Sequence, residues 1–395
     1  MTNLFFIKQC DGIDIAKATF VACIAKMLSD HRIIFTDKRT FDNNKTGYNQ
    51  FLKWVRKCTD KNNLILYNME ATGVYYESLA YHLNNLKKDI SVVLPNKASH
   101  YTKSLNIKSK TDEIDAQVLA QMGCERNLRK WTAPIELFRE LKALGRLHHT
   151  LGHDKTMAIN RLKQIKSGYK PLEEAVKFHQ SSIKRIKKQQ GLVIAKMISL
   201  AKTDEKIWSK MCNLTTIYGI AIKSVLVVVS ELNGFTMINN VRQLVSFCGL
   251  DVVQTQSGTS INGKSRISKK GNSFVRGALF MPAMSATRGD NEVARNYHRL
   301  VANGKNKKVA LIATERKILI LMYTLWNSDQ PYNPNYQTLK TSGCHEEEVP
   351  SSSSTRRVEK MCNMEKVVAS VRLTTTQNEH LYDQSSDVLL RQLQI

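Results

Sequence analysis

The chain has 395 residues, of which 42% are hydrophobic and 24% are charged, and its formal net charge is +25. This length supports a buried core and indicates two or three domains, since domains usually hold about 100–200 residues. A cationic surplus of this size argues against an enzyme that acts on small neutral molecules. It favours a polyanionic partner, either nucleic acid or an anionic membrane.

A membrane is the weaker of these two partners. No apolar run approaches the roughly 20 residues that a spanning helix needs, and the best candidate, 309–326, is interrupted by charges at 315–317. The segment MTNLFFIKQC lacks the length and the basic region of a signal peptide. The eight cysteines are scattered without a CxxC motif, which indicates reduced thiols and neither a zinc site nor a disulfide scaffold. We therefore expect a cytoplasmic, nucleoid-associated protein with no membrane partner.

Residues 1–132 alternate strand and helix signals, the pattern of an α/β domain. Strands are predicted at 12–24, 32–35, 64–67 and 90–94. Helices are predicted at 48–58, 76–86 and 114–123, where apolar residues recur at helical spacing.

The signal changes after this domain. Residues 133–210 show helical spacing with many lysines, which predicts long, basic, partly coiled helices with a break near 168–171. Both a solvated helical hairpin and an arm that dimerises or grips nucleic acid fit this pattern.

Residues 211–330 are predicted to form a third, mainly α-helical unit. Its helices are expected at 222–232, 273–287 and 307–326, with a Gly/Ser/Lys-rich loop at 256–272. The last segment, 331–395, has a net charge of −1, few aromatic residues and no sustained periodicity, so it is predicted to be a disordered tail.

Four carboxylates of the first domain occupy positions that suit a metal-dependent nuclease. Asp14 lies within an apolar strand, and Glu70 follows the strand 64–67, at the kind of strand end where open α/β sheets place ligand groups. Asp112 and Asp115 share one face at the start of a helix. Carboxylates that converge repel each other unless a divalent cation lies between them, and Mg²⁺ prefers oxygen ligands. The set therefore predicts a magnesium site, and a pair of such ions can clamp the attacking and leaving oxygens of a phosphodiester.

Each of the four also has a plain structural interpretation. Asp14 suits a charge at a strand edge, Glu70 a turn residue, and the two remaining aspartates a helix N-terminus. Taken singly these interpretations are preferable, but the ordered set favours the metal site because residues 1–330 carry a net charge of +26. Lys108 and Lys110 precede the aspartate pair and are predicted to bind the phosphate backbone.

A second cationic segment, QSGTSINGKSRISKKGNSFVRGALF, spans 256–280. Its glycines allow backbone amides to approach phosphates, although a solvated surface loop is the alternative. The cations predicted to bind nucleic acid here are Lys264, Arg266, Lys269, Lys270 and Arg276. Spacing alone selects no nucleophile, and the candidates are Ser257, Ser260, Ser265 and Ser268. No His/Asp partner of a hydrolase triad is apparent.

Three strings, GIDIAKATF (12–20), EATGVYYESLAYHL (70–83) and KTDEIDAQVLAQ (110–121), resemble the N-terminal domain of the DEDD insertion-sequence transposases. These are relatives of the Piv-type DNA invertases and have a RuvC-like, RNase-H-type fold. The four metal-binding carboxylates of the family match Asp14, Glu70, Asp112 and Asp115. The segment 256–280 is similar to the C-terminal transposase domain of the family, whose nucleophilic serine precedes a glycine and matches Ser257. The resemblance covers essentially 10–330.

This resemblance implies a DNA transposase or recombinase that cuts and rejoins strands at the ends of its own mobile element. It implies Mg²⁺ at the quartet and a phosphoserine link formed by Ser257 and resolved by a free hydroxyl. It further implies element-end and target DNA as partners, a bridge RNA as guide, and a homodimer or homotetramer. The chain departs from the family at 218–221, where the second glycine of a Pro-Gly-Ile-Gly-like turn is alanine, and at 249–253, which lacks the usual proline.

The residues leave two other functions open. One is a RuvC-like junction nuclease, in which the quartet activates water and the DNA ends stay unjoined. The other is a non-catalytic protein that binds DNA or RNA through its basic surface, as a decayed copy of an element would.

Overall fold

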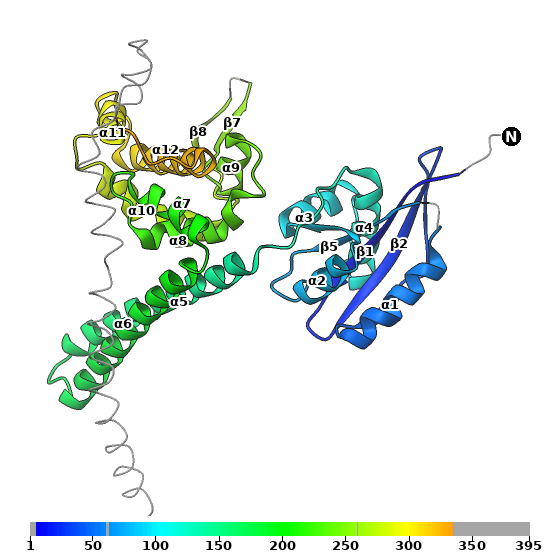
Figure 1. Cartoon of the computed structure of the whole chain (residues 1–395), viewed down its shortest axis with the longest axis horizontal. Coiled ribbons are helices and arrows are strands. Elements are labelled where there is room, and N and C mark those ends of the chain that lie inside the picture. Colours follow the sequence, from blue (N-terminus) through cyan, green and yellow to red (C-terminus); the bar gives the residue numbers. More distant parts are fainter. Residues whose placement is uncertain (1–4, 61–62, 259, 335–395) are drawn as a thin grey trace, which may run out of the picture. The chain divides into compact units, whose positions relative to one another are not determined.

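The computed structural model describes residues 5–60, 63–258 and 260–334. The chain divides into two compact units, 1–133 and 134–395, and each is described here by itself (Figure 1). Within the described residues, no helix combines the length and the apolar character that are needed to cross a membrane. The predicted tail, 331–395, lies outside the described residues from position 335 onward.

The first unit is a mixed sheet with helices packed against it. Its strands are β1 (Phe6–Ile15), β2 (Thr19–Leu28), β3 (Ile33–Phe35), β4 (Arg39–Asp42), β5 (Ile65–Glu70) and β6 (Asp89–Val93). Its helices are α1 (Lys45–Cys58), α2 (Glu77–Asn85), α3 (Pro95–Ser104) and α4 (Asp112–Glu125). The strand order is β3-β2-β1-β5-β6, with β4 also paired to β2. The strands β1, β2 and β3 are antiparallel, whereas β5 and β6 run parallel to β1.

The single strand predicted over 12–24 is wrong, because the segment contains a turn. Residues 16–18 are exposed, and the Ala16 amide donates to the Thr19 carbonyl at 2.9 Å, so β1 turns back into β2. Ile13 then lies opposite Ala22 in the antiparallel pair. The turn was hidden because β1 and β2 are both buried over most of their length, so their residues read as one continuous apolar run.

The two faces of the sheet are covered by different helices. Ile13 and Ile15 of β1 belong to the hydrophobic cluster that includes Phe51 and Val55 of α1. Cys10, on the alternate face of β1, packs in a second cluster with residues of α4. Side chains along a strand point alternately to its two sides, so Cys10, Gly12 and Asp14 share the face that α4 covers.

The second unit is mainly helical. Its helices are α5 (Glu136–Lys166), α6 (Glu173–Ala201), α7 (Glu205–Thr215), α8 (Ile222–Glu231), α9 (Val241–Phe247), α10 (Ser273–Ala286), α11 (Glu292–Ala302) and α12 (Lys307–Ser328), with a short 3₁₀ turn at Asn233–Phe235. α5 and α6 form the pair of long helices that the sequence predicted, and their connection contains the predicted break. Val225, Val228 and Val229 of α8 are fully buried, so α8 lies at the centre of the core.

The Gly/Ser/Lys-rich loop predicted at 256–272 is wrong for its first half. β7 (Val252–Ser257) and β8 (Ile261–Ile267) form an antiparallel hairpin, paired from Val252 with Ile267 to Ser257 with Ile261. Every residue of β7 is exposed. A strand exposed on both faces has no apolar alternation, so the pattern that identifies strands in a sequence is absent here.

Candidate active site

Asp14 and Glu70 lie side by side at the ends of two neighbouring strands. β1 and β5 pair in parallel up to Ile13 with Met69, and the next step in this register brings Asp14 opposite Glu70. Gly12 and Asn68 form the preceding pair on the same face. Glu70 is the last residue of β5, and Asp14, which the sequence predicts within a strand, is the last but one residue of β1, so both carboxylates lie at this edge of the sheet.

α4 crosses this face of β1 at close range because two glycines leave room for it. A Cβ on Gly12 would overlap the backbone of Ala116 and Ala120, and a Cβ on Gly123 would overlap the side chain of Cys10. These contacts show that α4 runs antiparallel to β1. The first turn of α4 therefore reaches the end of β1 that carries Asp14.

The start of α4 is fixed by its own cap, and its middle is held by a neighbouring strand. The Thr111 hydroxyl accepts a hydrogen bond from the Ile114 amide at 3.3 Å, and Asn68 Nδ2 donates to the Leu119 carbonyl at 2.8 Å. Because Thr111 is the cap, neither Asp112 nor Asp115 is needed for that purpose. Both aspartates lie in the first turn, where the partial positive charge of the helix terminus favours them.

The four carboxylates interact electrostatically. Burial is the main cause that raises the pKa of Asp14 to about 6, and the negative charges of Asp115, Asp112 and Glu70 contribute in that order, while the Ile15 amide opposes them. Asp112 is exposed and the other three are half-buried. Among the described residues none of the four takes part in an ion pair, although Glu70 Oε1 accepts a hydrogen bond from Thr72 Oγ1 at 3.2 Å. Their mutual repulsion is thus not neutralised by a paired lysine or arginine.

These residues fit a divalent cation by their chemistry. Carboxylate oxygens are hard donors of the kind that Mg²⁺ prefers, and their unneutralised charge favours a cation between them. In the described parts of the chain, however, no three His, Cys, Asp or Glu side chains stand in a ready-made metal-binding arrangement. The quartet is therefore a set of neighbouring carboxylates rather than a closed coordination shell.

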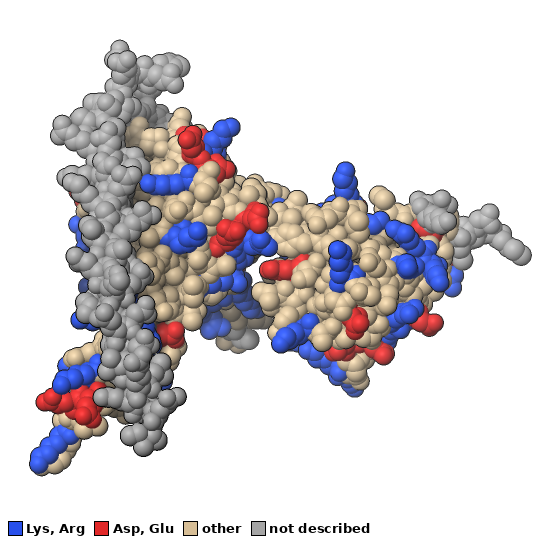
Figure 2. Space-filling model, turned by 60° about the horizontal axis from the view of Figure 1, so that its bottom comes forward, with Lys and Arg blue, Asp and Glu red and all other residues tan. Residues whose placement is uncertain are grey.

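The cations near the quartet include one that sequence reasoning missed. Lys38 Nζ lies 3.8 Å from Glu113 Oε2, beside the first turn of α4. No local pattern marks Lys38, because the strand that follows it, β4, is far from α4 in the sequence. Lys108 and Lys110 are exposed in the segment that joins α3 to α4, as a phosphate-binding role requires. On the face shown in Figure 2, Lys and Arg side chains are spread over both units.

Ser257 belongs to the second unit. It is the last residue of β7 and is exposed, and Gly258 follows with a φ of 54° that glycine adopts easily. Ser260 and Ser265 are also exposed. Ser268 Oγ instead donates to Asp251 Oδ1 at 2.5 Å and accepts from the Lys270 amide, so this hydroxyl is engaged in the foot of the hairpin.

The predicted cations of this segment fall into two groups. Arg266, Lys269 and Lys270 are exposed, and the side chain of Lys264 lies outside the described part of the structure. Arg276 is half-buried, and its Nη1 donates to the carbonyls of Cys248 at 2.7 Å and Gly271 at 3.1 Å. Arg276 thus has a structural contact that its place in a cationic run did not reveal.

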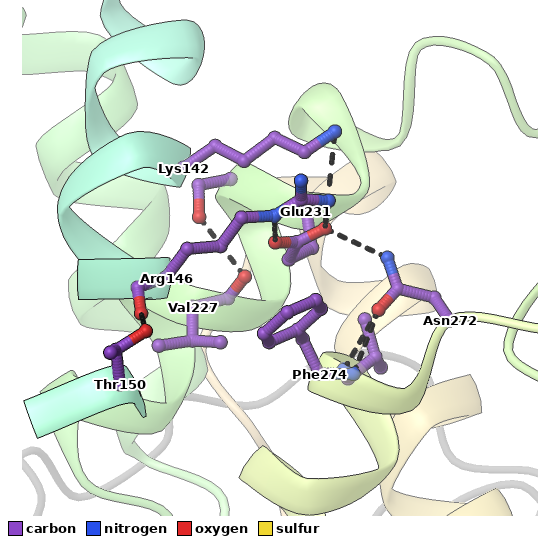
Figure 3. Close-up of polar contacts among 9 residues, drawn as sticks. Lys142, Arg146, Thr150, Val227, Glu231, Asn272 and Phe274 are labelled. Carbon is purple, nitrogen blue, oxygen red and sulfur yellow. Dashed lines mark hydrogen bonds and ion pairs between the residues drawn. The ribbon is translucent and has the colours of Figure 1, made fainter. Parts of the chain in front are cut away.

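A buried carboxylate that sequence reasoning missed supports the same segment (Figure 3). The Glu231 side chain is 2% exposed and accepts from Arg146 Nε at 2.9 Å and Nη2 at 3.3 Å, with Lys142 Nζ at 3.9 Å. Asn272 Nδ2 also donates to Glu231, at 2.8 Å, while Asn272 Oδ1 caps α10 by accepting from the Phe274 amide at 3.0 Å. Glu231 thereby connects α5 and α8 to the start of α10, which follows the hairpin.

The comparisons agree with this arrangement of two units. Residues 12–171 match the model of the IS110-type DEDD transposases, described as a transposase, and residues 211–299 match the model described as the transposase IS116/IS110/IS902 family. The pilin gene-inverting protein of Moraxella lacunata is 30% identical over 336 residues, covering 82% of this chain and 97% of that protein. The pilin gene-inverting protein of Moraxella bovis is 28% identical over 333 residues, again covering 82% and 97%.

Among solved structures, T. thermophilus RuvC in complex with a Holliday junction substrate matches 31% of this chain and 99% of its own, with 6% identity and a TM-score of 0.24. A Ppx/GppA family protein of Aquifex aeolicus matches 86% and 99%, with 11% identity and a TM-score of 0.20. The family match, together with the order of the strands in the sheet, identifies the first unit as an RNase-H-like α/β domain. The chain belongs to the IS110 family of transposases and is a DNA transposase or recombinase.

Proposed function

We propose that this recombinase cuts and rejoins DNA with the carboxylate quartet of the first unit and the Ser257 hydroxyl of the second. The observation that supports the proposal most strongly is the packing of β5 and α4 against β1, since the strand register sets Glu70 beside Asp14 and the first turn of α4, with its aspartates, reaches the same strand end. The negative charges of Asp115, Asp112 and Glu70 also contribute to the raised pKa of Asp14. Carboxylates from two strands and one helix act on one another in a chain of net charge +25. An unneutralised acidic group in so cationic a protein suits a metal-dependent phosphoryl-transfer site.

The quartet and the serine have separate roles. Asp14, Glu70, Asp112 and Asp115 would hold Mg²⁺, which supplies Lewis acidity to a phosphate when bound. Ser257 Oγ forms a bond to the scissile phosphorus, the bond from phosphorus to one strand end breaks, and that end leaves as a hydroxyl with the serine proton. A hydroxyl of another strand then attacks the phosphorus and releases the serine. One phosphodiester bond replaces another, so rejoining needs no ATP.

The partners follow from the same proposal. Lys108, Lys110, Arg266, Lys269 and Lys270 are exposed cations that suit DNA phosphates. The family resemblance supports a bridge RNA as guide, and recombination of two duplexes supports a homodimer or homotetramer. The relatives named pilin gene-inverting proteins favour inversion of a DNA segment as a second outcome of the same chemistry.

The deciding experiment incubates the full chain with Mg²⁺, the ends of its element and the flanking noncoding RNA. We expect a covalent protein–DNA adduct on a denaturing gel and joined product. Ser257→Ala should remove the adduct, while Ser265→Ala, at an exposed serine of β8, serves as the matched control. Asp14→Asn should abolish adduct and product while leaving DNA affinity near that of the wild type.

Other outcomes identify the alternatives. An adduct that persists in Ser257→Ala moves the nucleophile to another residue, with Ser260 next to be tested. Cleaved DNA without an adduct points to attack by water, as in a junction nuclease. Binding without any Mg²⁺-dependent product would leave only a nucleic-acid-binding role.

A further inference from the structure

A group of basic side chains gathers where α5, α6 and α8 meet in the second unit. α5 and α8 run antiparallel, since Lys142 lies 3.9 Å from Glu231 at the end of α8, whereas a Cβ on Gly145, further along α5, would lie 3.7 Å from the earlier residue Val227. One turn further along α5, the facing residue of α8 is Lys223. The group consists of His148, His149, Lys155 and Lys223, and it is called the α5–α8 cationic cluster below.

The cluster combines buried side chains, His148 and the neighbouring Gln190, with a lysine, Lys223, that solvent can reach. His148 is 8% exposed, and Lys155 Nζ donates to Oε1 of the buried Gln190 on α6 at 3.0 Å. Lys223, the second residue of α8, is exposed, and no side chain caps this end of the helix. The partial positive charge at the N-terminus of α8 and the ammonium groups of Lys155 and Lys223 therefore create a positive potential in the same region.

No carboxylate neutralises the cluster in the part of the chain that the structure describes. Glu231, at the opposite end of α8, is already occupied by Arg146 and Lys142. After Glu140, the α5 sequence contains a single acid, Asp154, which is in no ion pair within the described residues. The acids of α6 are confined to its first turn, far along the helix from Gln190.

The like charges oppose one another in the free protein. Although Lys223 is exposed as a residue, partial desolvation of its ammonium group is the main cause that lowers its pKa, and Lys155 lowers it further. Burial is also the main cause that lowers the pKa of His148 to about 4, with contributions from Lys223, Lys155 and His149. An arrangement that is costly without an anion becomes favourable when an anion enters, because one negative charge then interacts with both ammonium groups.

We infer that the α5–α8 cationic cluster binds a backbone phosphate of nucleic acid. Lys155 and Lys223 are placed to contact the phosphate from two helices, and Lys187, exposed about one turn before Gln190 on α6, adds to the positive surface. The inference rests on the DNA-handling role of the family, but not on the quartet or on Ser257. The cluster would hold DNA or RNA at a place that takes no part in the chemistry.

The test measures binding of the full chain to fluorescent duplex DNA of random sequence, and separately to single-stranded RNA, in EDTA at several salt concentrations. The variant is Lys155→Gln/Lys223→Gln. The matched control is Lys163→Gln/Lys166→Gln, which removes the same charge from exposed positions at the far end of α5. On duplex DNA the log–log salt slope should fall by roughly 0.9 for each phosphate that the protein no longer neutralises, and more in the variant than in the control. The nucleic acid whose binding weakens more is the one that the cluster holds.

Equal salt slopes in the variant and the control, with both nucleic acids, would overturn the inference. Thermal unfolding provides a second measurement: Lys223→Gln should leave the Tm unchanged or raise it, because it relieves repulsion. A lowered Tm would instead assign Lys223 a structural role and also overturn the inference. Because these assays contain no divalent metal, a reduced slope in a chain that forms no covalent adduct would uphold the cluster and reject only the proposed chemistry.

Discussion

Gly12 of β1 lies directly against the backbone carbonyl of Ala116 in α4, so closely that a Cβ at Gly12 would overlap the Ala116 oxygen. This contact sets the distance between the strand that carries Asp14 and the helix that carries Asp115. The quartet therefore depends on a residue with no side chain. Within the segment GIDIAKATF, Gly12 allows α4 to pack closely and Asp14 contributes a negative charge to the quartet.

Gly12→Ala should destabilise the first unit and weaken DNA cleavage together. The added methyl has only backbone atoms to displace, and overpacking of this kind costs about 1–3 kcal/mol. Urea unfolding and adduct yield provide the two measurements. Gly277→Ala is the control, since a Cβ there meets nothing within 4 Å and replacing glycine within a helix adds up to about 1 kcal/mol of stability. An unchanged unfolding midpoint in Gly12→Ala would contradict the packing role.

The sequence predicted those features that depend on local pattern. The sequence predicts Glu70 at a strand end because it follows an apolar run, and Asp14 within a strand because it interrupts one, while Asp112 and Asp115 share a helix turn by spacing alone. The register that brings Asp14 opposite Glu70 follows from strand pairing, which a single chain pattern does not encode.

The features that were missed depend on contacts between distant segments or on weak patterns. Lys38, Glu231 and Lys223 acquire their roles from helices and strands that are far away in the sequence. The turn at 16–18 lies between two strands that are both buried, and β7 of the hairpin is exposed on both sides. Neither has the alternation of apolar and polar residues by which strand ends are recognised.

Asp11 is a second acid of β1, and it faces the core rather than the quartet. It is fully buried, and neither carboxylate oxygen has a hydrogen-bond partner among the described residues. Burial raises its pKa well above the usual range. The folded chain therefore keeps Asp11 protonated at pH values where the unfolded chain, with a pKa of about 3.9, has already ionised.

Stability should consequently fall as the pH rises above the unfolded pKa, by at most about 1.4 kcal/mol per pH unit from this group. Asp11→Asn removes this dependence. The free energy of unfolding of the variant, relative to that of the wild type, should therefore increase between about pH 5 and about pH 7.5. Urea unfolding at both pH values measures the gain. Parallel pH dependence in the two proteins would show that Asp11 does not titrate in this way.

Glu315 of α12 is a second buried acid that should make the chain less stable as the pH rises, and here the pH range of the loss is defined. It is 4% exposed, and burial raises its pKa to about 7, although Arg276 opposes this rise. Its stabilising contribution is complete below the unfolded pKa of about 4.3 and is lost as the pH rises to about 7. Glu315→Gln should therefore match the wild type near about pH 4 and exceed it above about pH 7. Glu174→Gln, at an exposed position of α6, should show no such divergence in urea unfolding.

Glu231 and Arg146 form the ion pair whose removal should affect the hairpin most. Glu231→Ala leaves Arg146 and Lys142 without their acid and frees Asn272 from α8; since the side chains of Arg146 and Lys142 are 46% and 40% exposed and become hydrated, we expect a cost of about 1–3 kcal/mol. Adduct formation should decline as well, because the hairpin that carries Ser257 loses support at the start of α10.

A double-mutant cycle with Arg146→Met separates the pair from its surroundings. The ion pair predicts that the two substitutions together cost less than the sum of each alone, with a coupling of about 0.5–3 kcal/mol in urea unfolding. Arg139→Met is the control partner, because Arg139 bonds Glu136 near the start of the same helix and should add independently to Glu231→Ala. If Arg146 and Glu231 were also additive, the contact would contribute to geometry without contributing to stability. The support of the hairpin would then come from its other contacts, among them those of Ser268, Asn272 and Arg276.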